Sequence, residues 1–152
     1  MTEGYRYTAC GLDYVYLQNG YTVHEDRNYG RGISIKDARG LHSAIARFVV
    51  SAPAPLRGQE VRFLRSQLKL SQEGLARVLQ QSRGSVARWE GAPNEEIPGV
   101  ADSALRLFYA LEADGHELAK KIVVLLKEID DLEHKMHVLE FVDTDEGWKK
   151  AA

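Results

Sequence analysis

The chain has 152 residues, of which 44% are hydrophobic and 28% charged, with a formal net charge of −2 at pH 7, as is ordinary for one or two globular domains. No apolar run approaches the ~18 residues of a membrane span, and the N-terminus lacks the basic and apolar regions of a signal peptide, so we expect a cytoplasmic protein with no membrane partner. Cys10 is the only cysteine, which excludes an intramolecular disulfide and a cysteine-based metal site.

The first predicted elements are two strands around an Asn-Gly pair at 19–20. The runs 14–17 and 21–24 are rich in aromatic and β-branched residues, and such runs around Asn-Gly are the strongest short signal for a hairpin. In a two-residue turn, Tyr16 would lie opposite Val23. The pattern therefore predicts an antiparallel hairpin.

A polar loop at 26–32 separates this hairpin from a third predicted strand at 33–35. Asp37 can cap a following helix, whose buried side would comprise Leu41, Ile45, Phe48 and Val49. We expect residues 1–52 to form a small β-rich α+β region. A stiff connector with two prolines, residues 51–55, leads from it to the next part of the chain.

Three helices are then predicted in close succession. The first covers about 58–69. Ser71 can cap the second and Ser82 the third, with Gln80 and Gln81 interrupting the apolar pattern between them. The apolar positions are Val61, Leu64 and Leu68 on the first helix, Leu75, Ala76, Val78 and Leu79 on the second, and Val86 and Trp89 on the third. Two short helices joined by a tight turn, the second carrying outward arginines, indicate a helix-turn-helix.

A further helix led by Pro98 would follow, with its apolar side formed by Ala101, Ala104, Leu105, Phe108 and Leu111. From His116 another helix repeats apolar residues at alternating spacings of four and three, at Leu118, Ile122, Leu125, Ile129, Leu132 and Met136. This heptad pattern favours pairing of two helices. A strand over 137–142, a polar turn and an anchoring Trp148 complete the expected C-terminal region, 113–152, which we expect to dimerise.

The stretch from Leu70 to Glu90 resembles the Cro/CI-type (XRE) helix-turn-helix of bacterial and phage regulators. The matching positions are Ser71-Gln72-Glu73, Leu75-Ala76, Ser82, Val86 and Arg88-Trp89-Glu90. The family usually has glycine and an aliphatic residue where this chain has Gln80 and Gln81, so we expect the turn to differ slightly. The resemblance implies a helical bundle over 56–112 that binds double-stranded DNA.

In that family, the outward residues at the start of the second helix of the motif, and one turn later, face base edges. Arginine can bind guanine through two parallel hydrogen bonds, so Arg83 and Arg88 would carry most of the readout. Gln72 takes the position that contacts a phosphate or supports the recognition helix. The expected DNA-binding residues are Gln72, Ser82, Arg83, Gly84, Ser85 and Arg88.

The charge distribution agrees with this expectation. Residues 57–91 contain seven bases and three acids, so 7 − 3 gives +4, an excess suited to phosphates. From residue 112 to the end there are six bases and eleven acids, so 6 − 11 gives −5, and this acidic part should point away from DNA.

The fold class expected is α+β and mainly α: the small N-terminal sheet with a helix, the helix-turn-helix bundle, and a C-terminal helix with a short strand. The function expected is that of a sequence-specific transcriptional regulator, a repressor acting as a homodimer on a palindromic operator.

An alternative function is that of an antitoxin. The motif region also resembles the DNA-binding domain of MqsA-type antitoxins, which share the segment Arg88-Trp89-Glu90 and a proline-led helix. In those proteins the arginine matching Arg88 reads a base. The zinc-binding domain of those antitoxins has no counterpart in this chain, because its cysteines are missing. An antitoxin that binds a partner toxin and represses its own operon therefore remains the alternative.

Other arrangements of reactive residues receive less support from the sequence. Asp130, His134 and His137 could share a helix face as metal ligands, but such spacing is more often found among surface residues. Cys10 could act with His24 or His42 as nucleophile and base, but no flanking motif supports this pairing. We expect no enzymatic activity, no cofactor and no bound metal.

Overall fold

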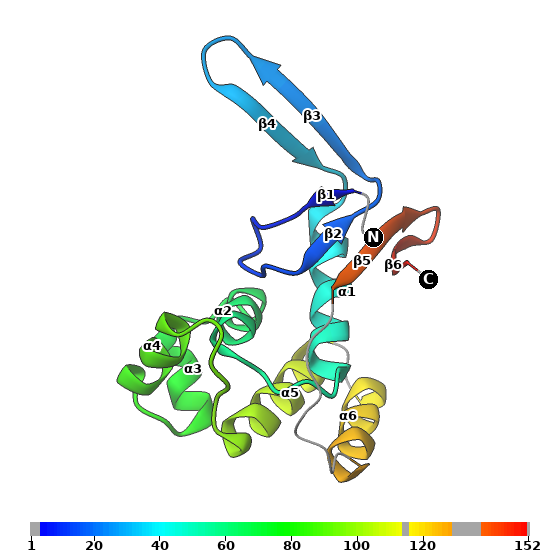
Figure 1. The fold of residues 1–152 in the computed structure, drawn as a ribbon. Helices are drawn as coiled ribbons and strands as arrows, with labels where there is room; N and C mark the ends of the chain where they lie inside the picture. Colours follow the sequence, from blue (N-terminus) through cyan, green and yellow to red (C-terminus); the bar gives the residue numbers. More distant parts are fainter. Residues whose placement is uncertain (1–3, 114–115, 129–137, 152) are drawn as a thin grey trace. The chain divides into compact units, whose positions relative to one another are not determined.

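The computed structural model describes residues 4–113, 116–128 and 138–151. It confirms an α+β chain in which helices predominate (Figure 1). The chain forms two compact units, one made of residues 1–45 and 137–152 and the other of residues 46–136. These units divide the chain differently from the three segments expected from the sequence, because the C-terminal strands join the N-terminal sheet.

The main sheet of the first unit has the strand order β1-β2-β5-β6. Its strands are β1 (Tyr5–Arg6), β2 (Val15–Leu17), β5 (Leu139–Thr144) and β6 (Gly147–Lys150). β2 pairs in parallel with β5, so that Val15 lies opposite Leu139 and Leu17 opposite Phe141. The other two pairings are antiparallel. Val15, Leu17 and Phe141 are fully buried, so the centre of this sheet is built from both ends of the chain.

The predicted hairpin around residues 19–20 is wrong. β3 (Tyr21–Asp26) pairs instead with β4 (Gly30–Ile35), which confirms the third predicted strand, and Val23 lies opposite Ile33. β2 has β1 and β5 on its two sides, so it has no free edge for β3. Asn19 and Gly20 form a corner between the two sheets, where Asn19 Oδ1 accepts a hydrogen bond from the Asp143 backbone N at 2.7 Å.

Trp148 anchors the C-terminal hairpin, as predicted. Its indole Nε1 donates to the carbonyl oxygens of Lys36 and Asp37 at 3.1 and 3.0 Å. A Cβ atom on Gly20 would approach the Trp148 ring to 2.4 Å, so only glycine leaves the ring its space. An ion pair between Lys36 and Asp143 at 3.1 Å joins the residue after β4 to β5.

Helix α1 (Ala38–Ser51) begins after Asp37, whose Oδ1 accepts from the Gly40 backbone N at 3.1 Å. This confirms the predicted cap. Of the four residues expected to be buried, Leu41, Ile45 and Val49 are buried and Phe48 is 39% exposed. The buried stripe also includes Ala46 and Val50, which shifts its centre and leaves Phe48 at the edge.

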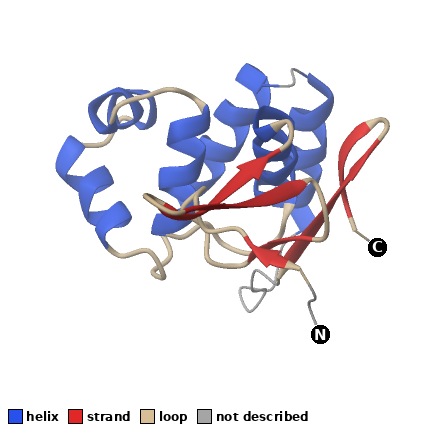
Figure 2. Ribbon diagram, turned by 90° about the horizontal axis from the view of Figure 1, so that it is seen from above, coloured by secondary structure: helices blue, strands red, loops and turns tan. Residues whose placement is uncertain are grey.

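The second unit is helical in its described part (Figure 2). After the end of α1 it contains α2 (Gly58–Gln67), α3 (Gln72–Leu79), α4 (Arg83–Gly91), α5 (Gly99–Ala113) and α6 (His116–Glu128). Its fully buried apolar side chains include Leu56, Val61, Leu64, Leu75, Val86, Leu105 and Ile122. On α5, Leu111 was expected to be buried but is 53% exposed, whereas Tyr109 is buried.

α6 packs against α5 and buries Leu118 and Ile122. These first two positions of the predicted dimerisation stripe are therefore covered within the chain. Leu125 is half-buried. The remaining positions, Ile129, Leu132 and Met136, lie outside the described residues.

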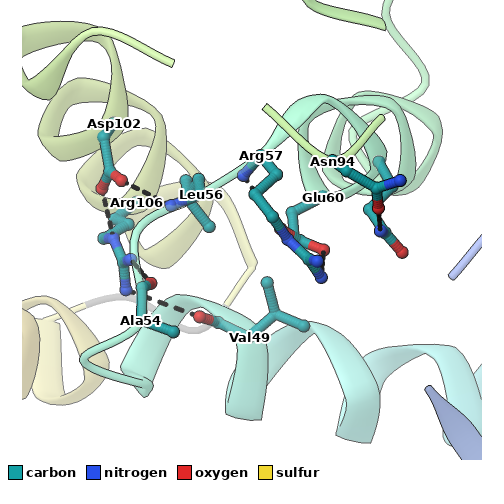
Figure 3. A network of polar contacts seen from close by, with 9 residues as sticks. Val49, Ala54, Leu56, Arg57, Glu60, Asn94, Asp102 and Arg106 are labelled. Carbon is teal, nitrogen blue, oxygen red and sulfur yellow. Dashed lines mark hydrogen bonds and ion pairs between the residues drawn. The ribbon is translucent and has the colours of Figure 1, made fainter. Parts of the chain in front are cut away.

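Arg106 on α5 is the largest fully buried side chain of the described chain, at 1% exposure. Its guanidinium caps the C-terminal end of α1 and the connector that follows (Figure 3). Nη1 donates to the carbonyls of Val50 at 2.9 Å and Ala52 at 2.6 Å, and Nη2 to the carbonyl of Ala54 at 2.6 Å. These carbonyls have no backbone N–H donor of a following helical turn, and the N–H groups of Arg106 take the place of those donors.

Asp102, one turn before Arg106, completes this network. Its Oδ1 accepts from Arg106 Nε at 2.5 Å, and its Oδ2 accepts from the Leu56 backbone N at 2.7 Å. The buried positive charge is thus balanced by a carboxylate that is itself hydrogen-bonded. The connector is held at both ends by one turn of α5.

None of the helices in the described part of the chain combines the length and the apolar character that a membrane crossing requires.

We expect Arg106→Met to lower the free energy of unfolding by about 3–5 kcal/mol, because it leaves Asp102 and several carbonyls buried without their partner. Urea denaturation followed by circular dichroism measures the change. Arg62→Met, at an exposed arginine on α2, is the matched control and should stay within about 0.5 kcal/mol of wild type. Equal stabilities of the two variants would contradict a structural role for Arg106.

Candidate nucleic-acid interface

α3 and α4 form a helix-turn-helix closed by a left-handed residue. Ser71 Oγ caps α3 by accepting from the Gly74 backbone N at 2.9 Å. At the other end Gln80 has φ 53°. The Gln81 backbone N donates to the Ala76 carbonyl at 2.8 Å, and the Gln80 backbone N donates to the Arg77 carbonyl at 3.3 Å. This is the Schellman arrangement, in which glycine usually occupies the left-handed position.

α4 begins at a capped N-terminus and has one buried side. Ser82 Oγ accepts from the Ser85 backbone N at 3.0 Å, which confirms the predicted cap. Val86 is fully buried, while Trp89 is half-buried. On α3, Val78 was expected on the apolar side but is 38% exposed.

α2 fixes α4 through a two-pronged ion pair. Arg65 Nε and Nη2 donate to the two carboxylate oxygens of Glu90 at 2.7 and 2.8 Å, and Arg65 Nη1 donates to the Leu70 carbonyl at 3.0 Å. The hydrogen bond to Glu90 raises the pKa of Arg65 above its usual value, so the guanidinium stays charged. A Cβ on Gly58 would approach the Trp89 carbonyl oxygen to 1.9 Å, which shows how closely the two helices meet.

The six residues predicted to bind DNA all lie on this motif. Gln72 is the half-buried first residue of α3, and Ser85 is half-buried on α4. The exposed members are Ser82, Arg83, Gly84 and Arg88. Two of these six residues are therefore exposed arginines, one at the first residue of α4 and one a turn and a half later.

Three of these residues are joined by hydrogen bonds. Ser82 Oγ and Ser85 Oγ lie 3.0 Å apart, and Arg88 Nη2 donates to Ser85 Oγ at 3.2 Å. The sequence did not predict this row of hydrogen bonds. Its signal is the spacing of three between the members, which places them on one side of a helix.

Arg83 takes part in a different feature, an open hollow of about 520 Å³ between α3 and the start of α4. The residues lining it are Glu73, Ala76, Arg77, Gln81 and Arg83. Arg77 and Glu73 form an ion pair at 3.6 Å at exposed positions. Sequence reasoning did not assign Arg77 or Gln81 to the interface.

Each of the three acids in residues 57–91 is engaged by an arginine. Glu60, which is fully buried, binds Arg57 through both oxygens at 3.0 Å (Figure 3). Glu90 binds Arg65, and Glu73 binds Arg77. The formal excess of +4 therefore falls on four exposed residues, Arg62, Lys69, Arg83 and Arg88.

The surroundings of Cys10 do not support the hypothesis that its thiol acts as a nucleophile with a histidine as base. Tyr7 Oη lies 2.7 Å from His42 Nε2, so the tyrosine engages that imidazole nitrogen. Burial raises the pKa of the Cys10 thiol and lowers the pKa of His42. A reactive cysteine needs a lowered pKa. Asp130, His134 and His137, the possible metal ligands, lie outside the described residues.

Comparisons with known proteins give no relative: no protein-family model, curated protein or solved structure matches the chain.

The left-handed turn residue generates a test of this motif. Gln80→Gly should raise the free energy of unfolding by about 0.5–1 kcal/mol. The substitution removes the strain of a side chain on a left-handed backbone, and this gain outweighs the greater conformational freedom of glycine in the unfolded chain. Gln81→Gly is the neighbouring control and should lower it by about as much, since Gln81 has no such strain to relieve. Thermal and urea denaturation measure both. A loss of stability in Gln80→Gly would contradict the turn as described.

Proposed function

We propose that the protein is a sequence-specific double-stranded DNA-binding transcriptional regulator that acts as a repressor. The observation that carries this proposal is the capped helix-turn-helix whose second helix exposes Arg83 and Arg88. The four exposed cations of residues 57–91 support it, because a local positive excess beside a groove-sized helix suits the phosphate backbone.

In this mechanism α4 enters the major groove, which admits one helix. Arg83 and Arg88 read base edges, with guanine as the preferred partner because its O6 and N7 accept both prongs of a guanidinium. Gln72, at the start of α3, meets a phosphate. The regulator would act in the cytoplasm and need no cofactor.

One recognition helix reads only a few base pairs, so selectivity in a genome requires two. We propose a homodimer whose recognition helices lie about 34 Å apart, one turn of DNA, on a palindromic operator. Repression would follow from exclusion of polymerase from the occupied site.

Selection of bound sequences from random duplexes tests the proposal as a whole. The expected result is a motif of two inverted half-sites whose centres are about 10 base pairs apart. A single half-site would retain DNA reading but reject the dimer. Recovery of unselected sequence at every position would reject sequence-specific binding.

Arg88→Ala should weaken binding to the selected site by about 1–3 kcal/mol and relax the preference at one base position. The melting temperature should hardly move, because Arg88 is exposed. Quantitative binding to the selected site and to single-base variants measures the effect. An equal loss on specific and random DNA would show that Arg88 meets only phosphate.

Binding should also fall steeply with salt, because cations that neutralise phosphates release counterions. In Arg62→Gln/Lys69→Gln, which removes the two exposed cations that are not assigned to bases, the slope of log binding constant against log salt should become shallower by about one unit per lost phosphate contact. Arg65→Gln is the contrasting variant: it should cost about 1.5–3 kcal/mol of stability by leaving Glu90 without its partner. A binding constant independent of salt would reject the proposed function.

A further inference from the structure

The hydrogen-bonded chain on α4 joins the helix cap to an exposed arginine. Ser82 Oγ already accepts the Ser85 backbone N–H, and it lies within hydrogen-bond distance of Ser85 Oγ. Ser85 Oγ in turn accepts from Arg88 Nη2. The guanidinium is thereby drawn along α4 toward the N-terminal end of the helix.

The hydrogen bond to Ser85 matters because an exposed arginine side chain without such a partner samples many rotamers. Ordering a free arginine side chain costs rotamer entropy. Binding is tighter when this ordering precedes it. One Nη group of Arg88 is occupied by Ser85, and the guanidinium carries five N–H donors, so donors remain for a base.

We propose that Ser85 is a positioning residue for Arg88: its hydroxyl holds the guanidinium ready for a guanine edge in the major groove and so sets base preference without touching the base itself. This inference rests on the proposed function. It reassigns Ser85, which the resemblance would place in direct contact with DNA.

The side chain of Ser85 is well suited to a clean substitution. The cap of α4 uses the backbone N of Ser85 and the hydroxyl of Ser82, so Ser85→Ala leaves the cap intact. Alanine also has the higher helix propensity. A loss of discrimination in this variant would therefore not come from a weakened helix.

The experiment is a double-mutant cycle on the full chain, with wild type, Ser85→Ala, Arg88→Ala and the double variant. Affinities are measured for the duplex selected by the wild type and for the same duplex with the base pair read by Arg88 replaced. Ser85→Ala should reduce the ratio of the two affinities by about threefold to tenfold. In the Arg88→Ala background the same substitution should change nothing.

Ser85→Thr is the conservative variant, and because it keeps a hydroxyl it should restore the ratio. A second readout needs no DNA: nitrogen-15 relaxation of the Arg88 side chain should show faster motion in Ser85→Ala than in wild type. Additive losses in the cycle would show that Ser85 contacts DNA itself and would overturn the inference. Unchanged discrimination in Ser85→Ala, with Arg88→Ala impaired, would overturn it while leaving the proposed function standing. Absence of any selected sequence for wild type would reject both.

Discussion

Burial of the Arg106 charge is the constraint on which the helical unit depends. A guanidinium without partners inside a protein is strongly unfavourable. Helix α5 can therefore pack only where carbonyl oxygens can accept hydrogen bonds from the Arg106 guanidinium. The end of α1 and the connector after it provide those oxygens, and Asp102 balances the charge while binding Leu56. Satisfaction of this network specifies one path for residues 50–56, and that path delivers the chain to the start of α2.

The motif surface rests on similar two-pronged contacts. Glu60 and Glu90 are held by Arg57 and Arg65, so the charges of these two arginines are balanced within the fold. Two of the cations left at the surface, Arg83 and Arg88, lie on α4, whose start is capped by Ser82 and which follows the turn at Gln80. A rigid scaffold of this kind is what a base-reading side chain requires, because small displacements spoil directional hydrogen bonds.

Sequence reasoning succeeded where the signals are local. The caps at Asp37, Ser71 and Ser82 and the helix-turn-helix spacing were predicted, because each depends on residues within one or two turns. It failed where partners are distant: the Asn-Gly pair predicts a hairpin, but β2 is taken by β1 and β5. Arg106 could not be foreseen, since arginine is rarely fully buried and its acceptors converge only in the folded unit. The spacing of Ser82, Ser85 and Arg88 is visible in the sequence, but the hydrogen bonds that join them depend on side-chain rotamers, which the spacing does not specify.

The parallel pairing of β2 with β5 bears on the order in which the chain can fold. The hydrogen bond between Gln18 and Glu140 spans 122 residues, so the first unit cannot complete its sheet until residues 139–150 have left the ribosome. The helical unit is contiguous and rich in short-range contacts, which form fast. During synthesis the edge of β2 that pairs with β5 stays unpaired until β5 has been made. An unpaired strand edge is prone to association with other chains. The late arrival of residues 139–150 therefore both finishes the sheet and ends the period in which the nascent protein is most exposed to aggregation.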